Sequence, residues 1–341
     1  MRYIIIGAGA VGGAIGGRLA GSGYEVVLVA RGAHHRALSE NGLTLTTPDG
    51  TRTHRLPVVE GPEGVQLTQD DVLVLAVKTQ DSTGALEAWA GRPVTSGGTA
   101  GERLPLVCAQ NGVESERLAL RRFRHVYGVC VYLPATHVEP GRVSAAGAPL
   151  TGILHLGRYP SGADDTVRGI AADLEKSHFL APVVPDVMRW KYGKLMANLE
   201  NAAEAVTGRR ADDEVKLLLA RASAEGRAVL AAAGIAVVSA AEESDARSGR
   251  MELRPLEGRP RGGGSSWQSL DRGTGTIEAD YLNGEVALLG RLHGVPTPVN
   301  DVLQRTANVF ARERRPAGSM TLDELNALVD AEVEMALSER T

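Results

Sequence analysis

Four polar residues that could take part in chemistry recur at helical spacing in the second half of the chain: Lys191, Lys194, Asn198 and Asn201. They lie in the segment WKYGKLMANLEN, residues 190–201, whose composition favours a helix. At ~100° per residue, the four side chains fall within roughly one quarter of the helix circumference. An amine can donate a proton or a hydrogen bond, and a carboxamide can both donate and accept. The stripe therefore either faces water or lines a polar cleft that binds a ligand.

A second candidate site is the glycine turn near the start of the chain, in the segment YIIIGAGAVGGAIGGRLA. Gly7, Gly9 and Gly12 have the G-x-G-x-x-G spacing, directly after an apolar strand and at the start of a helical pattern. The first glycine permits a tight turn, the second lets the backbone approach a pyrophosphate, and the third lets the helix pack on the strand. The helix start, at Ala10 and Val11, offers N–H groups to the anion. The turn predicts a dinucleotide site.

The end of the second strand bears on which dinucleotide binds. An enzyme that prefers NAD usually has an acidic residue there, whereas an arginine can pair with the 2′-phosphate of NADP. In the segment EVVLVARG, Arg31 directly follows the apolar strand, so we expect NADP(H); the other interpretation is a solvated surface arginine. His34 and His35 follow in a helix-start region, and we expect both to be exposed.

Polar residues also follow two later strands. Lys78 follows LVLAV, and Asn111 follows LVCAQ and precedes a glycine. In an open doubly wound sheet, ligands bind at the carboxyl ends of the strands, where the nicotinamide would lie. Taken alone, Lys78 could be a surface lysine, and Asn111 could simply form an Asn-Gly turn.

The elements that must position these residues form two patterns. Short strands that are apolar throughout alternate with helical patterns in the first half, which indicates an α/β fold with a doubly wound parallel sheet of the Rossmann type. These strands are expected at 3–6, 25–30, 71–77 and 104–109. Residues 125–147 and 151–157 suggest an antiparallel extension with a Pro-Gly turn at 140–141, and a helix is expected at 163–177.

Two prolines at residues 181–186 mark the expected domain boundary. We therefore expect a dinucleotide-binding domain at 1–183 and an all-helical domain at 184–341. Its helices are expected near 187–206, 212–233, 276–293, 297–313 and 321–338, the last with a capping box at Thr321 to Glu324, and 256–266 is a glycine-rich loop.

Composition limits the class of protein. The chain has 341 residues, a net charge of −4 and no basic cluster, which argues against nucleic acid as a partner and favours a small molecule. No apolar run is long enough to cross a bilayer, and the chain starts directly with a strand, so we expect a cytoplasmic protein without a membrane partner. Cys108 and Cys130 lie in apolar strands, as core thiols do, and we expect no metal site. A monomer and a homodimer both remain open.

With these motifs in their observed order, the sequence resembles the ketopantoate reductase (2-dehydropantoate 2-reductase) family, over residues 1 to about 313. The resemblance rests on GAGAVGGAIGGRLA, LVARG, AVKTQ, QNGVE, KLMAN and SSWQSLDRGTGTIEADYLNG. It implies an N-terminal dinucleotide domain followed by an all-helical domain, and NADPH-dependent reduction of ketopantoate in pantothenate and coenzyme A biosynthesis.

The resemblance also implies residue roles. Lys194 would be the catalytic lysine, with Asn198 and Ser266 binding substrate and Glu278 beside the reacting group. Asn111 and Lys78 would work at the nicotinamide side, and Arg31 would meet the 2′-phosphate. The chemistry agrees, because hydride addition to a ketone leaves negative charge on oxygen, which an amine can protonate. The other interpretations are a solvated lysine, an exposed acid at a helix start for Glu278, and a helix cap for Ser266.

Two positions depart from the family pattern. The family often has a second asparagine four residues after the first, but here that position is Ala202, and Asn201, which we include among the substrate-binding residues, lies one place earlier. Gly263 stands where another asparagine is frequent. The leading hypothesis is thus an NADPH-dependent reductase of a small 2-oxo acid, with ketopantoate first. The alternatives are a reductase of a different 2-oxo acid or related ketone, and a non-catalytic NADP(H)-binding sensor or interaction protein.

Overall fold

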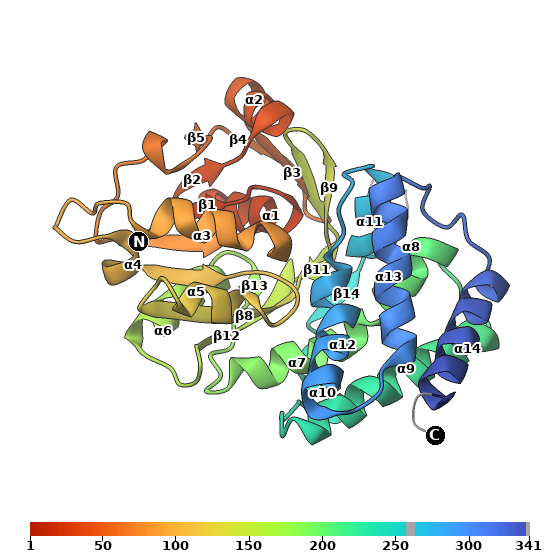
Figure 1. Cartoon of the computed structure of the whole chain (residues 1–341). Coiled ribbons are helices and arrows are strands. Elements are labelled where there is room, and N and C mark those ends of the chain that lie inside the picture. Colours follow the sequence, from red (N-terminus) through yellow and green to blue (C-terminus); the bar gives the residue numbers. More distant parts are fainter. Residues whose placement is uncertain (257–262, 339–341) are drawn as a thin grey trace. The chain divides into compact units, whose positions relative to one another are not determined.

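The computed structural model describes residues 1–256 and 263–338, which fold into two compact units (Figure 1). Unit 1 comprises Met1–Lys191 and Val238–Arg261, and unit 2 comprises Tyr192–Val237 and Gly262–Thr341. The expected boundary at 181–186 therefore differs from this division, which falls inside a helix and returns a later segment of the chain to unit 1.

Unit 1 is built on an eight-stranded sheet with the spatial order β13-β12-β8-β7-β6-β1-β2-β5. Its strands are β1 (Arg2–Ile6), β2 (Glu25–Val29), β5 (Val58–Val59), β6 (Asp71–Leu75), β7 (Pro105–Cys108), β8 (His125–Tyr132), β12 (Gly152–Arg158) and β13 (Phe179–Leu180). β1 pairs in parallel with both β2 and β6, so later strands are added to the sheet on both sides of β1. This is the doubly wound order, and the predicted Rossmann-type fold is confirmed.

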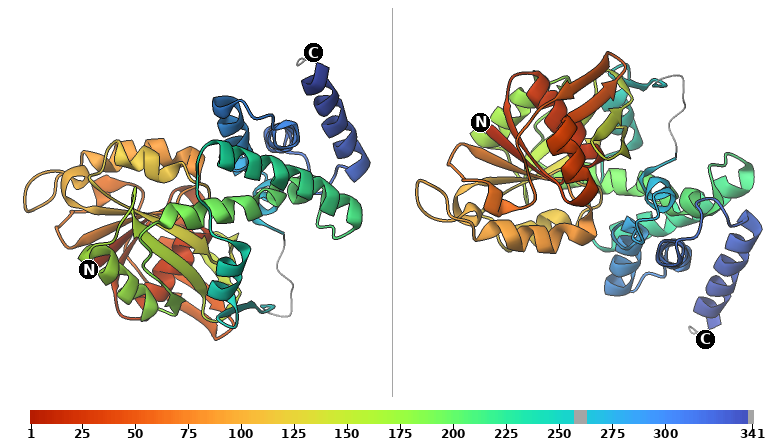
Figure 2. Two further views of the ribbon diagram at one scale, coloured as in Figure 1. Left: turned by 90° about the horizontal axis from the view of Figure 1, so that it is seen from below. Right: turned by 90° about the horizontal axis from the view of Figure 1, so that it is seen from above.

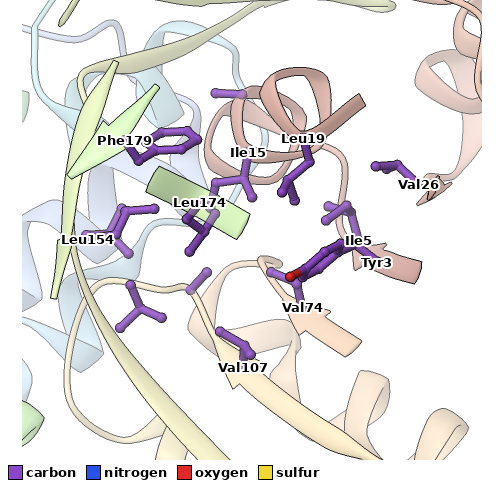
Figure 3. Packing of buried hydrophobic residues seen from close by; sticks show 14 of the residues in the cluster. Tyr3, Ile5, Ile15, Leu19, Val26, Val74, Val107, Leu154, Leu174 and Phe179 are labelled. Atoms are coloured by element: carbon purple, nitrogen blue, oxygen red, sulfur yellow. The ribbon is translucent and has the colours of Figure 1, made fainter. Parts of the chain in front are cut away.

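Helices cover both faces of this sheet, which explains why its strands are apolar throughout (Figure 2). On one face, Ile5 packs with Ile15 of α1 (Ala10–Gly21) and Leu174 of α6 (Asp165–Glu175), as Figure 3 shows. On the other face, Ile4 packs with buried residues of α3 (Ser82–Ala90), α4 (Ala100–Arg103) and α5 (Ser115–Leu120). Cys108 and Cys130 are buried in β7 and β8, as predicted.

The antiparallel extension is only partly as expected. β12 does pair antiparallel with β8. The Pro-Gly turn at 140–141 is also present, but its strands β9 (Ala135–Glu139) and β10 (Arg142–Ala145) join a separate sheet. Their partners are β3 (Leu43–Thr47) and β4 (Gly50–His54). Val143 of β10 is buried beside Gly13 of α1, so the strand covers that helix and does not widen the main sheet.

The segment Val238–Arg261 lies between helices of unit 2 along the chain but belongs to unit 1. It contains α10 (Ala240–Arg247) and β14 (Met251–Leu253), neither of which the sequence indicated. β14 pairs antiparallel with β11 (Gly147–Pro149), and Glu242 of α10 accepts two hydrogen bonds from Arg189, at 2.8 and 2.6 Å. The glycine-rich loop expected at 256–266 lies mostly outside the described residues.

Unit 2 is helical, as predicted. Helix α7 (Val187–Asn198) begins in unit 1 and ends in unit 2. The helices that follow are α8 (Glu200–Thr207), α9 (Asp213–Ala232), α11 (Ser265–Asp271), α12 (Asn283–His293), α13 (Pro298–Glu313) and α14 (Leu322–Ser338). The capping box before α14 is confirmed, because Thr321 N–H donates to Glu324 and Glu324 N–H donates back to the Thr321 hydroxyl.

The remaining elements are helix α2 (Gly32–Asn41) and the short 3₁₀ turns η1 (Pro62–Gly64), η2 (Thr79–Asp81) and η3 (Glu278–Tyr281). Within residues 1–256 and 263–338, no helix is both long and apolar enough to cross a membrane.

Candidate active site

The glycine turn between β1 and α1 has the shape that a dinucleotide requires. Gly7 has φ +101°, and a β-carbon on it would lie 2.7 Å from the amide nitrogen of Val77. A β-carbon on Gly12 would lie 2.1 Å from the carbonyl oxygen of Gly7. Beside Gly9, in contrast, a β-carbon would meet nothing within 4 Å. Packing therefore requires glycine at positions 7 and 12. Gly9 instead leaves open space over the backbone, as an approaching pyrophosphate needs.

The helix start supplies hydrogen-bond donors at this open space. Gly9 is the N-cap of α1 and makes no side-chain cap. The N–H groups of Ala10, Val11 and Gly12 belong to the first turn of the helix, where no intrahelical carbonyl is available to them. Together with the positive end of the helix dipole, these groups fit a phosphate anion.

Arg31 lies close along the chain to the glycine turn. The carbonyl oxygen of Val29, at the end of β2, accepts hydrogen bonds from the N–H groups of Gly7 (3.2 Å) and Ala8 (3.0 Å). Two residues later, Arg31 is exposed and forms the N-cap of α2. Its guanidinium makes no ion pair with any described residue. This position suits a group that meets the ribose end of a dinucleotide.

His34 holds the glycine turn from outside, which corrects the expectation that it is exposed. Gly141 N–H donates to Nδ1 of His34 (3.0 Å), so Nδ1 carries no proton and Nε2–H donates to the carbonyl oxygen of Ala8 (2.7 Å). Burial lowers the pKa of His34, which favours this neutral form. His35 is also partly buried, with its ring 3.7 Å from Glu60. Both histidines of α2 are therefore partly buried against other residues of unit 1.

The structure brings together the loops that carry Lys78 and Asn111. The side-chain amide of Gln110 donates to the carbonyl oxygen of Val77 (2.6 Å), and the hydroxyl of Thr79 donates to the carbonyl oxygen of Asn111 (3.4 Å). Both loops leave the carboxyl ends of neighbouring parallel strands. Gly112 has φ +74°, so the Asn-Gly turn is present, and Asn111 is half-buried within it.

The polar stripe on the helix divides into two parts. Lys191 is 3% exposed and forms a salt bridge with the fully buried Glu116 of α5, so it faces neither water nor a wet cleft. Lys194, Asn198 and Asn201 are half-buried. Helix α7 ends at Asn198, and Asn201 belongs to the next helix, α8.

The two departures from the family pattern have clear surroundings in unit 2. Ala202 is 2% exposed in the helical core, so position 202 faces other apolar side chains. A β-carbon on Gly263 would lie 3.0 Å from Oε1 of Glu204. Oε2 of the same carboxylate accepts a hydrogen bond from Gly264 N–H (2.7 Å). A longer residue 263 would therefore meet both Glu204 and the side chain of Trp267, whose Cγ would lie 2.8 Å from the same β-carbon.

Asn201 and Ser266 lie around this same start of α11. A β-carbon on Gly264 would be 3.1 Å from Oδ1 of Asn201. Ser266 is 3% exposed and is the second residue of α11, whose N-cap is Gly264. The interpretation of Ser266 as a helix cap is therefore wrong.

Glu278 begins the short turn η3 and is 9% exposed. This contradicts the interpretation of Glu278 as an exposed acid at a helix start. A carboxylate at this depth carries a desolvation cost that a purely solvated residue would not. Its burial is compatible with a role in a site.

Three residues of these networks were not identified from the sequence: Gln110, Glu116 and Glu204. The signal for Gln110 was its position directly after an apolar strand, next to Asn111. Glu116 and Glu204 carried no such signal, because their partners are distant in sequence. Within the described part of the chain, no group of three or more potential metal ligands is present.

Two family models match this chain. The one described as ketopantoate reductase PanE/ApbA matches residues 3–161, and the one described as ketopantoate reductase PanE/ApbA C terminal matches residues 186–311. A 2-dehydropantoate 2-reductase of Mesorhizobium japonicum is 31% identical, over 92% of this chain and 99% of its own length. A 2-dehydropantoate 2-reductase of Pyrococcus horikoshii is 25% identical, over 94% of this chain and 100% of its own length.

Solved structures agree with these matches. A PanE/ApbA family ketopantoate reductase from Ralstonia eutropha has a TM-score of 0.75 at 26% identity, covering 92% of this chain and all (100%) of that one. D-mandelate dehydrogenase, solved with NADH and anilino(oxo)acetate, has the same fold, with a TM-score of 0.75 at 22% identity over 93% of this chain. The chain therefore belongs to the ketopantoate reductase PanE/ApbA family and is an oxidoreductase that acts on a ketone.

Proposed function

We propose that this chain uses NADPH to reduce a small 2-oxo acid to the 2-hydroxy acid, with 2-dehydropantoate, which would become pantoate in coenzyme A biosynthesis, as the first substrate. The observation that carries the proposal is the glycine turn, in which Gly7 and Gly12 are sterically required and Gly9 is open. The exposed Arg31 after β2 supports NADPH over NADH. Relatives named 2-dehydropantoate 2-reductase, similar over nearly their whole length, support the substrate.

The proposed chemistry assigns one proton to Lys194. When bound, the reduced nicotinamide supplies a hydride to the carbonyl carbon of the substrate. The carbonyl oxygen then gains negative charge, and the ammonium Nζ of Lys194 stabilises this charge and donates the proton that completes the alcohol. The half-buried position of Lys194 on α7 suits this role, because partial removal of water strengthens the electrostatic interaction.

The other predicted residues bind and orient. Asn198 and Ser266 offer neutral hydrogen bonds to the substrate. The Glu278 carboxylate accepts from a substrate hydroxyl or holds the lysine amine in place. Lys78 and Asn111, on adjoining loops, would contact the nicotinamide end.

Glu204 favours a second candidate, a reductase of a different 2-oxo acid or related ketone. Its carboxylate lies beside Gly263 and Gly264, which are three and two residues before Ser266. A fixed carboxylate there repels a second anionic group and attracts a hydrogen-bond donor. A substrate that places a hydroxyl or amine near Ser266 would fit this arrangement better than one that places a carboxylate there.

The deciding experiment is NADPH oxidation measured with a panel of 2-oxo acids and neutral ketones, with 2-dehydropantoate included. Turnover of 2-dehydropantoate at the highest kcat/KM supports the proposal, and a clear preference for another compound supports the second candidate. Binding of NADPH without oxidation by any compound would contradict both, and would instead support a non-catalytic sensor. Lys194→Ala is the control for adventitious activity.

A further inference from the structure

A buried ion pair lies beneath the loops that carry Lys78 and Asn111. Nζ of Lys191, in α7, forms a salt bridge with Oε1 of Glu116, in α5. The two side chains are 2% and 0% exposed. All of these residues belong to unit 1, so the pair is part of the dinucleotide-binding fold even though Lys191 shares a helix with Lys194.

The same amine reaches the end of β7. Nζ of Lys191 donates to the main-chain carbonyl oxygen of Gln110 (3.2 Å). The side chain of Gln110 then donates to the carbonyl oxygen of Val77 (2.6 Å) and to the hydroxyl of Ser82 (2.8 Å). Gln110 and Val77 directly precede Asn111 and Lys78. A single charged group therefore joins α5 to the two strand ends from which both predicted nicotinamide-side residues project.

We propose that Lys191 is a positioning residue for the nicotinamide side of the site, which acts by fixing the main chain at Gln110 and, through it, at Val77. The proposal rests on the function proposed above, since it takes Lys78 and Asn111 as contacts of the cofactor. Lys191 itself touches neither substrate nor cofactor. Glu116 holds the amine in place, and the hydrogen bond to Gln110 transmits that position to the loops.

The energetics of buried ion pairs distinguish positioning from simple stabilisation. An ion pair removed from water gains little stability over an apolar pair of similar volume, because desolvation offsets the attraction. Loss of one partner is costly because it leaves the other charge buried alone. What an apolar pair cannot replace is the donor to the carbonyl oxygen of Gln110. Stability and positioning should therefore separate when both partners are replaced together.

The test compares Lys191→Met, Glu116→Leu and the double variant with wild type. For each protein we measure the urea midpoint of unfolding, and kcat and KM on the best substrate found. We also measure its affinity for NADPH and for 2′-phospho-ADP-ribose, a fragment of the cofactor that lacks the nicotinamide. We expect both single variants to be destabilised and the double variant to regain most of the stability. Compared with wild type, the double variant should nevertheless lose about tenfold to a hundredfold in NADPH affinity or in kcat. Small displacements of reacting groups carry penalties of this size. Its affinity for the fragment should stay at the wild-type value.

Wild-type kinetics and NADPH affinity in the stable double variant would overturn the proposal, as would an equal loss of affinity for the fragment. If the double variant does not fold, Glu116→Gln decides, because it weakens the ion pair but leaves the amine to donate to Gln110. We expect Glu116→Gln to keep NADPH affinity within about threefold of wild type, and a loss equal to that of Lys191→Met would overturn the proposal.

The binding measurements also separate this proposal from the proposed function. If wild type binds NADPH but reduces no 2-oxo acid, the proposed function fails while the affinity comparison still tests Lys191. If wild type turns over but the double variant is unchanged in both assays, only the positioning role fails.

Discussion

The carbonyl oxygen of Gly7 lies so close to the α-carbon of Gly12 that a β-carbon at position 12 would be 2.1 Å from it. This contact lets α1 start directly against the end of β1. Gly9, between the two, has no such neighbour and leaves free space over its backbone. The turn thus contains two glycines, Gly7 and Gly12, that packing requires, and one, Gly9, whose backbone has open space beside it.

These glycines give the first prediction. Gly12→Ala should destabilise unit 1 by about 2 kcal/mol or more, because the overlap with Gly7 can be relieved only by moving the helix. Gly9→Ala should fold with nearly wild-type stability but lose at least about tenfold in NADPH affinity, because its methyl group occupies the space for the pyrophosphate. Urea denaturation and NADPH titration measure the two effects. Wild-type NADPH affinity in Gly9→Ala would place the pyrophosphate elsewhere.

The second prediction concerns Arg31. Removal of a charge-assisted contact to the 2′-phosphate should cost about 1.5 to 3 kcal/mol, so Arg31→Ala should weaken NADPH binding by about tenfold to a hundredfold and leave NADH binding unchanged. Arg36→Ala is the matched control, because Arg36 is an exposed arginine on the same helix, α2. Titration of both cofactors tests this. Equal affinity of wild type for NADPH and NADH, or unchanged NADPH affinity in Arg31→Ala, would exclude Arg31 from the site.

The third prediction concerns Lys194. General acid catalysis typically contributes ~10² to 10⁴ in rate, so Lys194→Ala should reduce kcat at least a hundredfold while NADPH still binds. Lys191 cannot serve as the comparison, because its replacement would leave the buried Glu116 without its partner. Lys216→Ala can, because Lys216 is 65% exposed on α9 of unit 2. Turnover of Lys194→Ala within about tenfold of wild type would mean that the proton comes from water or another residue.

The fourth prediction concerns Glu278. Glu278→Gln should lower kcat or raise KM for the 2-oxo acid. The neutral amide has one acceptor oxygen in place of two and cannot balance a positive charge as the carboxylate does. NADPH affinity should stay near wild type, since Glu278 belongs to unit 2 and the glycine turn to unit 1. The exposed Glu313, replaced by Gln, is the control. A parallel loss of NADPH affinity would show damage to the fold and leave the assignment without support.

The fifth prediction concerns stability against pH. Burial lowers the pKa of His155 in β12 to about 4, with a smaller contribution from Arg250. In the unfolded chain the imidazole titrates near its ordinary value of 6.5. The neutral form therefore contributes full stability above pH ~6.5, and this contribution is lost as the pH falls towards 4, by at most about 3 kcal/mol.

His155→Phe isolates this effect. The ring of His155 stacks on Trp190 with a centroid distance of 3.8 Å, and a phenyl ring can keep that contact. We expect urea denaturation to show a smaller loss of stability between pH 7 and pH 5 in the variant than in wild type. An identical loss in both proteins would mean that other groups account for the acid sensitivity.

Local signals predicted the parts of this protein that depend on neighbours in sequence. The strand at 3–6, the glycine turn and the helix that it opens were predicted from the apolar run and the glycine spacing, and the capping box at Thr321 was predicted from its sequence pattern. The sheet to which a strand belongs, in contrast, depends on its pairing with strands that are distant in the sequence. β9 and β10 were therefore recognised as a hairpin but assigned to the wrong sheet.

The same reason explains the error at Lys191. Helical periodicity gave its angular position on the helix, which it shares with Lys194, but could not show that Glu116, 75 residues away, lies beside it. His34 is similar, because its partner Gly141 is 107 residues distant. Periodicity predicts which residues share a face, and only the tertiary fold determines what that face meets.

The pairing of β14 with β11 also has a consequence for synthesis of the chain. Unit 1 is complete only when the segment Val238–Arg261 is available. A ribosome, which makes the chain from its N-terminus, delivers α8 and α9 of unit 2 before it delivers the last strand of unit 1. Until then, β11 has an unpaired edge, and Arg189 lacks the carboxylate of Glu242. Unit 1 therefore cannot finish folding before α8 and α9 of unit 2 have been synthesised, and a fragment that ends at Lys191 would leave unit 1 incomplete.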